Sequence, residues 1–212
     1  RERERAELGE LIANPQCRLI TITGPGGIGK TRLALAAAAD QSGKFRHGAV
    51  FVPLAGVSMA QFLPQAILNA LEIPAQGERS PRQQVRRVLA AQEHLLVLDN
   101  YEHLLPAFEL LVELLHYAPR TTFLVTSRER LALQAEQLFD LTGLDYPQQR
   151  PLPSEVNPLQ ALTTYPAFQL FSQRVRQTQP RFTPNGEEIA AIVRICAITE
   201  GMPLALELAA AA

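Results

Sequence analysis

Short, almost wholly apolar runs alternate with longer amphipathic stretches along the first two thirds of the chain. Such runs, without polar alternation, are typical of strands that are buried on both faces of a parallel sheet. The five runs are Leu19–Thr23, Ala49–Ala55, His94–Asp99, Thr121–Thr126 and Leu138–Thr142. Their alternation with helical stretches predicts βαβ units and a doubly wound α/β sheet.

The stretches between these runs carry helix-start signals. Ser58–Gln61 and Ser80–Gln83 both have the spacing of a capping box, in which the first side chain and the fourth satisfy each other's backbone N–H groups. One helix is predicted over Tyr101–Tyr117, because apolar residues recur there at helical spacing. Its apolar face comprises Leu104, Leu105, Phe108, Leu111, Val112 and Leu115.

The sequence changes character after Leu144, where a polar stretch holds four prolines that neither a helix nor a central strand accommodates. Only helical patterns follow. They are predicted over Pro166–Thr178, from Pro184 with Thr183 as N-cap to Gly201, and from Pro203 onward. We therefore expect an α/β domain over residues 1–146, a proline-rich linker over 147–163 and a small helical lid domain over 164–212. The chain stops within an alanine-rich helical pattern, so we also expect it to be a piece of a longer protein.

Composition narrows the function classes only slightly. Hydrophobic residues make up 47% of the chain and charged residues 19%, which allows a folded core, and the net charge is −1. This balance argues against direct nucleic-acid binding by this segment and against a membrane partner. No apolar stretch approaches the roughly 20 residues that span a bilayer, and Cys17 and Cys196 lack the neighbours of a zinc site. We expect a cytoplasmic location.

The first strand is followed at once by a glycine-rich loop and an alanine-rich helix, the context required for the phosphate-binding pattern G-x-x-x-x-G-K-[ST]. Glycines allow successive backbone N–H groups to face an anion, and the helix N-terminus adds partial positive charge. Lys30 is expected to reach the β- and γ-phosphates of a nucleotide, and the Thr31 hydroxyl to ligate Mg²⁺. The predicted binding residues are Gly24, Pro25, Gly26, Gly27, Ile28, Gly29, Lys30, Thr31 and Arg32.

Asp99 ends a buried apolar run, so it lies at the sheet edge where ligands bind in open α/β folds. We expect it to hold Mg²⁺ together with Thr31. The next residue is Asn100, which cannot accept a proton, whereas many ATPases with this loop carry an acid there. Glu102 and His103 are candidate substitutes; the alternative is that Asn100 caps a helix whose first turn accommodates Glu102. Slow ATP hydrolysis is expected.

Arg128 follows the fourth strand at the same sheet edge as Asp99. A guanidinium there is suited to binding the γ-phosphate and so to distinguishing ATP from ADP. A solvated surface arginine is the alternative, and Arg130 fits that description. We assign Lys30, Asp99 and Arg128 as the residues that carry the chemistry.

These motifs together resemble the NB-ARC-like branch of the STAND signalling NTPases, in particular bacterial members found in large regulators with helix-turn-helix or tetratricopeptide-type domains. The resemblance covers nearly the whole chain. It is carried by the segments RERERAEL at residues 1–8, GPGGIGKTRLAL at 24–35, LLVLDNYEHL at 95–104, TTFLVTSRERL at 121–131 and EGMPLALELAAA at 200–211. It implies a P-loop NTPase core of three layers with a five-stranded parallel sheet, followed by a small helical lid.

The resemblance also implies a function. ADP-bound and ATP-bound states would be the closed and open forms of a switch, often leading to oligomers, with Mg²⁺ as cofactor. Pro203 would pack near the adenine, and Arg1–Glu4 would help to frame it. The partners would be the winged-helix and sensor or repeat domains of the parent protein, which this chain does not contain.

Three other functions stay open on the residues alone. A small-molecule kinase would need an acceptor site and an arginine-rich lid, which the apolar GMPLALELAAA does not provide. A GTPase would need an N-K-x-D motif, and the sequence has none. A scaffold that keeps nucleotide as a structural ligand is favoured by Asn100.

Overall fold

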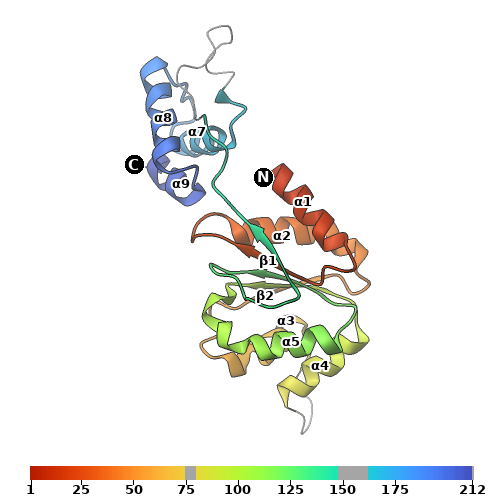
Figure 1. The fold of residues 1–212 in the computed structure, drawn as a ribbon. Coiled ribbons are helices and arrows are strands. Elements are labelled where there is room, and N and C mark those ends of the chain that lie inside the picture. The colour runs from red at the N-terminus through yellow and green to blue at the C-terminus, as the bar shows by residue number, and fades with distance from the viewer. Residues whose placement is uncertain (75–79, 148–161, 212) are drawn as a thin grey trace. The chain divides into compact units, whose positions relative to one another are not determined.

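The computed structural model describes residues 1–74, 80–147 and 162–211, and the chain divides into two compact units (Figure 1). The sheet unit consists of Glu2–Gly24 and Lys30–Leu141. The helical unit consists of Arg1, Pro25–Gly29 and Thr142–Ala212. The linker expected over 147–163 lies almost entirely outside the described residues, and the domain boundaries drawn from the sequence stay predictions.

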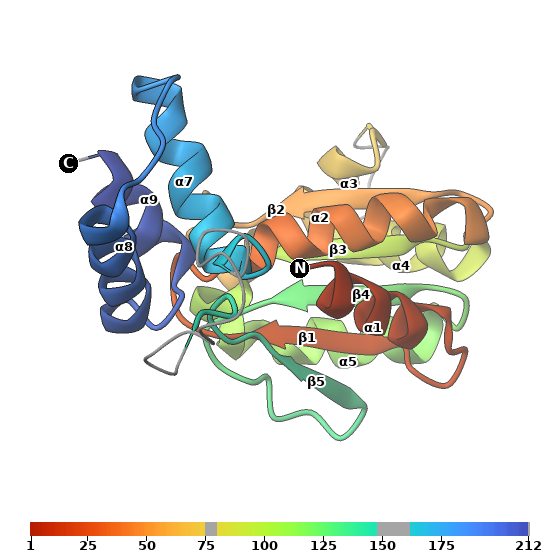
Figure 2. The same ribbon diagram turned by 90° about the horizontal axis from the view of Figure 1, so that it is seen from above.

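Five parallel strands form one sheet in the order β2-β3-β4-β1-β5 (Figure 2). The strands are β1 Leu19–Thr23, β2 Ala49–Pro53, β3 Leu95–Asp99, β4 Thr122–Thr126 and β5 Glu136–Asp140. β1 and β4 are buried throughout, and β3 is buried up to Asp99, because these strands are paired on both sides and covered on both faces. The predicted α/β fold with a five-stranded parallel sheet is confirmed.

The two edge strands differ from the prediction that every strand is buried on both faces. In β2 only Val52 is buried, and in β5 no residue is, with Leu138 38% exposed. β5 also begins and ends two residues earlier than predicted, because its backbone pairs with β1 from Glu136 onward. Backbone pairing at an edge does not depend on apolar side chains, so apolar runs locate such a strand poorly.

Helices cover both faces of this sheet (Figure 1). On one face lie α1 (Glu2–Ala13) and α2 (Lys30–Gln41), and on the other lie α3 (Leu63–Ala70), α4 (Pro81–Ala91) and α5 (Phe108–Tyr117). Short 3₁₀ turns connect them at η1 Ser42–Lys44, η2 Ala60–Phe62 and η3 Tyr101–Ala107. The larger core joins α3, α4 and α5 to the sheet through Val52, Ile67, Leu89, Leu96, Leu111 and Phe123.

The single helix predicted over Tyr101–Tyr117 is wrong, because the segment begins as the 3₁₀ turn η3 and becomes α-helical only at Phe108. A 3₁₀ turn has about 3.0 residues per turn and an α-helix 3.6, so one period cannot describe both. As a result Phe108 and Val112, placed on the apolar face by the sequence, are 45% and 46% exposed. Leu110 and Leu114 are buried instead.

The two predicted capping boxes have different outcomes. At α4 the Gln83 N–H donates to Ser80 Oγ over 3.4 Å, and the Ser80 N–H donates to Gln83 Oε1 over 3.3 Å. The box predicted at Ser58 is wrong: Met59 precedes η2 with no side-chain cap, and α3 begins at Leu63. At Ser80 a proline at the first helical position also fixes the start, a signal that Ser58 lacks.

The helical unit contains α7 (Pro166–Thr178), α8 (Gly186–Ile198) and α9 (Pro203–Ala211), with α7 and the start of α9 as predicted. They share a core of Phe168, Phe171, Ile192, Cys196 and Leu206. The N-cap of α8 is Asn185 rather than Thr183: its side chain accepts the Glu187 and Glu188 N–H groups, both over 3.0 Å. Both cysteines are free thiols, and burial raises the pKa of Cys196 to about 11.

Candidate functional site

The loop between β1 and α2 has the backbone that its glycines allow. Gly24, Gly27 and Gly29 all adopt positive φ, at +143°, +80° and +101°. Nothing lies within 4 Å of a Cβ built on Gly29, so its left-handed backbone, rather than crowding, is what requires glycine there. α2 then begins at Lys30, so the loop leads directly into a helix N-terminus.

Lys30 is buried at the start of α2, with 7% of its surface exposed, and its Nζ donates to the Gly24 carbonyl over 2.7 Å. Burial lowers the pKa of Lys30, and so does the charge of Arg128, whereas the charges of Glu102 and Asp99 raise it. All three charges are therefore close enough to act on this ammonium. The sheet unit thus gathers the three residues assigned from the sequence, Lys30, Asp99 and Arg128, into one electrostatic cluster.

Asp99 accepts two hydroxyl hydrogen bonds on the same oxygen. Thr31 Oγ1 and Thr126 Oγ1 each lie 2.7 Å from Asp99 Oδ1. Thr126 Oγ1 also accepts the Asn100 N–H over 2.9 Å, so it ties the end of β4 to the chain leaving β3. Thr126 was not among the residues predicted from the sequence; the signal that could have identified it is a hydroxyl at the end of a buried strand.

The donors around Asp99 suit Mg²⁺. This ion takes oxygen ligands and usually binds through one or two carboxylates together with substrate phosphates. Asp99 supplies a carboxylate, and Thr31 supplies a hydroxyl on the residue that follows the loop lysine. Among the residues described, no group of three or more histidine, cysteine or acidic side chains is placed so that it could hold a metal ion.

The residues that follow Asp99 do not form the helix cap considered from the sequence. Asn100 adopts φ +67°, whereas an N-cap residue has an extended backbone. His103 is directed elsewhere, with Nε2 2.8 Å from the Val57 carbonyl oxygen. Glu102 faces the cluster instead: its Oε1 lies 3.1 Å from Arg128 Nε, and its side chain is only 18% exposed. Of the two substitutes suggested for the missing acid, only Glu102 belongs to the site.

The remaining predicted residues lie as follows. Arg32 is exposed on α2, and Pro203 is half-buried at the first position of α9. Arg1, within the helical unit, donates to the Ile28 carbonyl over 3.2 Å and to the Thr142 carbonyl over 2.7 Å. The proposed adenine contacts of Arg1–Glu4 and Pro203 stay predictions.

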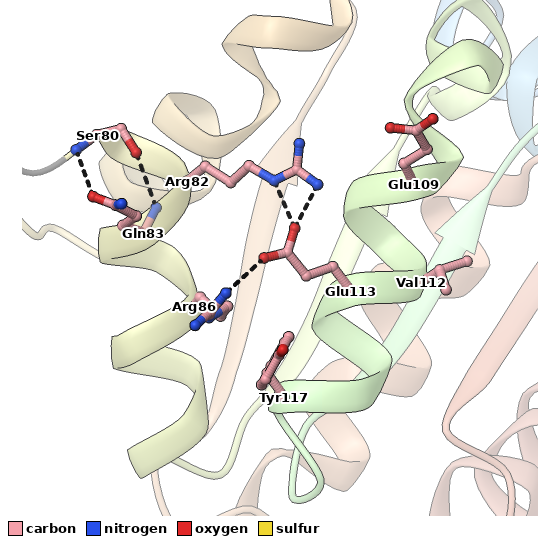
Figure 3. A pocket seen from close by; sticks show the side chains of 8 residues that line it. All are labelled: Ser80, Arg82, Gln83, Arg86, Glu109, Val112, Glu113 and Tyr117. Atoms are coloured by element: carbon pink, nitrogen blue, oxygen red, sulfur yellow. Dashed lines mark hydrogen bonds and ion pairs between the residues drawn. The ribbon is translucent and has the colours of Figure 1, made fainter.

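A surface groove of about 610 Å³ lies between α4 and α5 (Figure 3). Within it, Glu113 binds both Arg82 and Arg86, and Arg86 stacks 4.1 Å above the Tyr117 ring. Arg82 and Arg86 therefore link α4 to α5. Arg82 and Arg86 are thus already bound to Glu113, and no residue of the glycine loop lines the groove.

The Glu113 ion pairs give a pH-dependent contribution to stability. Burial raises the pKa of Glu113, but hydrogen bonds and charges from Arg82 and Arg86 outweigh it and hold the pKa below its usual value. Such a carboxylate stabilises the fold above its ordinary pKa of about 4.3, and the contribution is lost as pH falls through the folded-state pKa. Since both arginines are about half exposed, Glu113→Gln is expected to lower the free energy of unfolding by less than about 1 kcal/mol at pH 7.

Urea unfolding at pH 7 and pH 3 measures this difference. The difference in free energy of unfolding between wild type and Glu113→Gln should be smaller at pH 3 than at pH 7. Glu109→Gln, one turn earlier on α5 and without an ion pair to the described residues, should show no gap at either pH. An equal gap for Glu113→Gln at both values would contradict the ion-pair explanation.

Comparisons with known proteins agree with this geometry. Residues 13–131 match the sequence family described as AAA domain. A Mycobacterium tuberculosis protein named as an HTH-type transcriptional regulator is 36% identical over 197 residues, which is 92% of this chain and 20% of that protein. An uncharacterized Mycobacterium bovis protein is 36% identical over 195 residues, 92% of this chain and 45% of that protein. The chain thus spans less than half of either relative.

Solved structures share the fold at low identity. A STAND protein with a tetratricopeptide repeat sensor from Pyrococcus horikoshii gives a TM-score of 0.56 at 17% identity, over 100% of this chain and 29% of that one. Cdc6p from Pyrobaculum aerophilum gives a TM-score of 0.61 at 17% identity, over 99% of this chain and 59% of that one. The Orc1 protein of Aeropyrum pernix, solved in complex with DNA, gives a TM-score of 0.63 at 18% identity, over 99% of this chain and 58% of that one.

No helix in residues 1–74, 80–147 and 162–211 is long and apolar enough to cross a membrane. The matched range 13–131 is more than half of the chain and contains the glycine loop, Asp99 and Arg128. On the strength of this match, the chain belongs to the AAA domain family and is a P-loop ATPase domain of AAA type.

Proposed function

We propose that this chain is the ATP- and ADP-binding switch module of a larger signal-transduction ATPase of the NB-ARC-like STAND type. The observation that carries the proposal is the 2.7 Å contact between the Thr31 hydroxyl and the Asp99 carboxylate, beside the buried Lys30. It brings the residue after the loop lysine to the carboxylate at the end of β3, as Mg²⁺-dependent nucleotide binding requires.

Each residue of the cluster has a defined role in this function. Gly24–Gly29 would present backbone N–H groups to the α- and β-phosphates, and Lys30 would bind the β- and γ-phosphate oxygens. Thr31 and Asp99 would hold Mg²⁺, which neutralises phosphate charge when bound. Arg128 would bind the γ-phosphate, a group that ATP has and ADP lacks.

Hydrolysis is expected to be slow. Asn100 occupies the position after Asp99 and cannot accept a proton from an attacking water. The same residue supports a second candidate function, a scaffold that binds nucleotide without turnover. The apolar α9, in contrast, does not supply the arginines that a small-molecule kinase would need in a lid.

The parent protein would be larger than this chain. One relative is named as an HTH-type transcriptional regulator, and a structural neighbour is titled a STAND protein with a tetratricopeptide repeat sensor. We infer that the γ-phosphate biases a two-state arrangement that controls activation of a cytoplasmic regulator with winged-helix and sensor or repeat domains. Nucleotide-dependent homo-oligomers would be one output of this change.

Calorimetric titration of the nucleotide-stripped chain with ADP, ATPγS and GTP, with and without Mg²⁺, tests this function. Both adenine nucleotides should bind, more tightly with Mg²⁺, and GTP should bind at least about tenfold more weakly, a difference of about 1.4 kcal/mol. Steady-state hydrolysis should be very low. Preference for GTP, or no binding by a folded chain, would refute the switch assignment.

A further inference from the structure

Arg128, the residue assigned to the γ-phosphate, already has a carboxylate partner. Its Nε lies 3.1 Å from Glu102 Oε1, in an ion pair in which Arg128 is 65% exposed and Glu102 is 18% exposed. The second oxygen, Glu102 Oε2, is buried and has no hydrogen-bond partner among the described residues. A guanidinium presents several N–H donors and binds carboxylates and phosphates in the same way, so the two acceptors compete for it.

The pair is held by the backbone on both sides. Glu102 lies in η3, directly after the fully buried Tyr101. Asn100, at φ +67°, turns the chain at the end of β3, and its N–H is fixed by Thr126 Oγ1 over 2.9 Å. Thr126 is the last residue of β4, two positions before Arg128. The ends of two neighbouring strands therefore bring Glu102 and Arg128 together, which distinguishes this pair from one formed by two long mobile surface side chains.

We propose that Glu102 sets the discrimination between ATP and ADP by occupying Arg128 whenever no γ-phosphate is present. This inference rests on the proposed function. ADP leaves the Glu102–Arg128 pair intact, whereas ATP binds Arg128 only after the γ-phosphate has displaced the carboxylate. Part of the binding free energy that the γ-phosphate gains from Arg128 is thus offset by the loss of the Glu102–Arg128 ion pair. In consequence, the contacts of η3 change only when ATP binds, because only ATP releases Glu102 from Arg128.

The test is a double-mutant cycle on nucleotide affinity, measured by calorimetry with ATPγS and ADP in the presence of Mg²⁺. Glu102→Gln keeps the shape of the side chain and removes its charge. It should tighten ATPγS binding about three- to fivefold, as expected for loss of a partly exposed ion pair, and leave ADP affinity within twofold. Arg128→Ala should weaken ATPγS relative to ADP.

The cycle separates competition for Arg128 from a general effect of charge. In the Arg128→Ala background, Glu102→Gln should no longer change the ratio of ATPγS to ADP affinity, because the competing pair is already gone. Glu129→Gln, an exposed acid next to Arg128 in the chain, is the matched control and should leave the ratio unchanged.

The outcomes also separate this inference from the proposed function. Suppose that wild type binds both nucleotides, but that Glu102→Gln leaves the ratio of ATPγS to ADP affinity unchanged, or changes it equally in the Arg128→Ala background. Competition between Glu102 and the γ-phosphate is then refuted, whereas the proposed nucleotide site is not. If the folded wild type binds neither nucleotide, the function and the inference both fall. Circular dichroism of each variant confirms that the fold is retained.

Discussion

Lys30→Ala is expected to weaken binding of both ADP and ATPγS by about 100-fold or more. Lys30 is the buried cation at the start of α2, and its charge would be bonded to phosphate oxygens in the complex. Charge-assisted hydrogen bonds contribute about 1.5–3 kcal/mol each, and about 2.8 kcal/mol corresponds to 100-fold in affinity. The loss should affect both nucleotides, because each carries the β-phosphate.

The chain offers a matched control in its other lysine, Lys44, which is exposed in η1. Lys44→Ala makes the same change of charge and should leave both affinities within twofold. Calorimetric titration gives the affinities, and circular dichroism checks that the Lys30→Ala chain still folds. Wild-type affinity in a folded Lys30→Ala chain would remove the main support for phosphate binding by this loop.

Gly201→Ala is expected to destabilise the helical unit by about 3 kcal/mol or more. Gly201 has φ +67°, and its N–H bonds to the Cys196 carbonyl over 3.0 Å, which closes the C-terminus of α8. A Cβ there would lie 2.0 Å from the Leu144 backbone oxygen. Backbone has to move to relieve such an overlap, and the nearby Leu144 N–H bond to the Gly201 carbonyl, 2.8 Å long, would be strained with it.

Gly186→Ala makes the same chemical change without the clash. Gly186 is the first residue of α8, and nothing lies within 4 Å of a Cβ built on it. Since alanine favours helix more than glycine does, this variant should be neutral or more stable by up to about 1 kcal/mol. Hydrogen exchange of α8 amides, compared with β1 amides in the sheet unit, measures the difference. If the α8 amides exchange equally slowly in both variants, the close contact between Gly201 and Leu144 does not affect stability.

Local signals explain which parts of the fold could be predicted. The loop motif, the capping box at Ser80 and the start of α9 at Pro203 each depend on a few consecutive residues, so their backbone follows from sequence alone. The predictions failed where a distant partner decides the outcome. β5 begins at Glu136 because of its pairing with β1, and η3 interrupts the predicted helix where the chain leaves β3.

The sequence by itself determined the order of strands and helices and the glycine-rich loop that leads into Lys30 and Thr31, together with the position of Asp99 at a strand end, because periodicity and motif spacing are local properties. Only the tertiary structure decided how the candidate site is connected. Thr126 reaches Asp99, and Arg128 meets Glu102, because β3 and β4 are neighbours in the sheet although 26 residues or more separate the partners in the chain. Strand neighbours are chosen by the packing of the whole sheet, and no short segment records that choice.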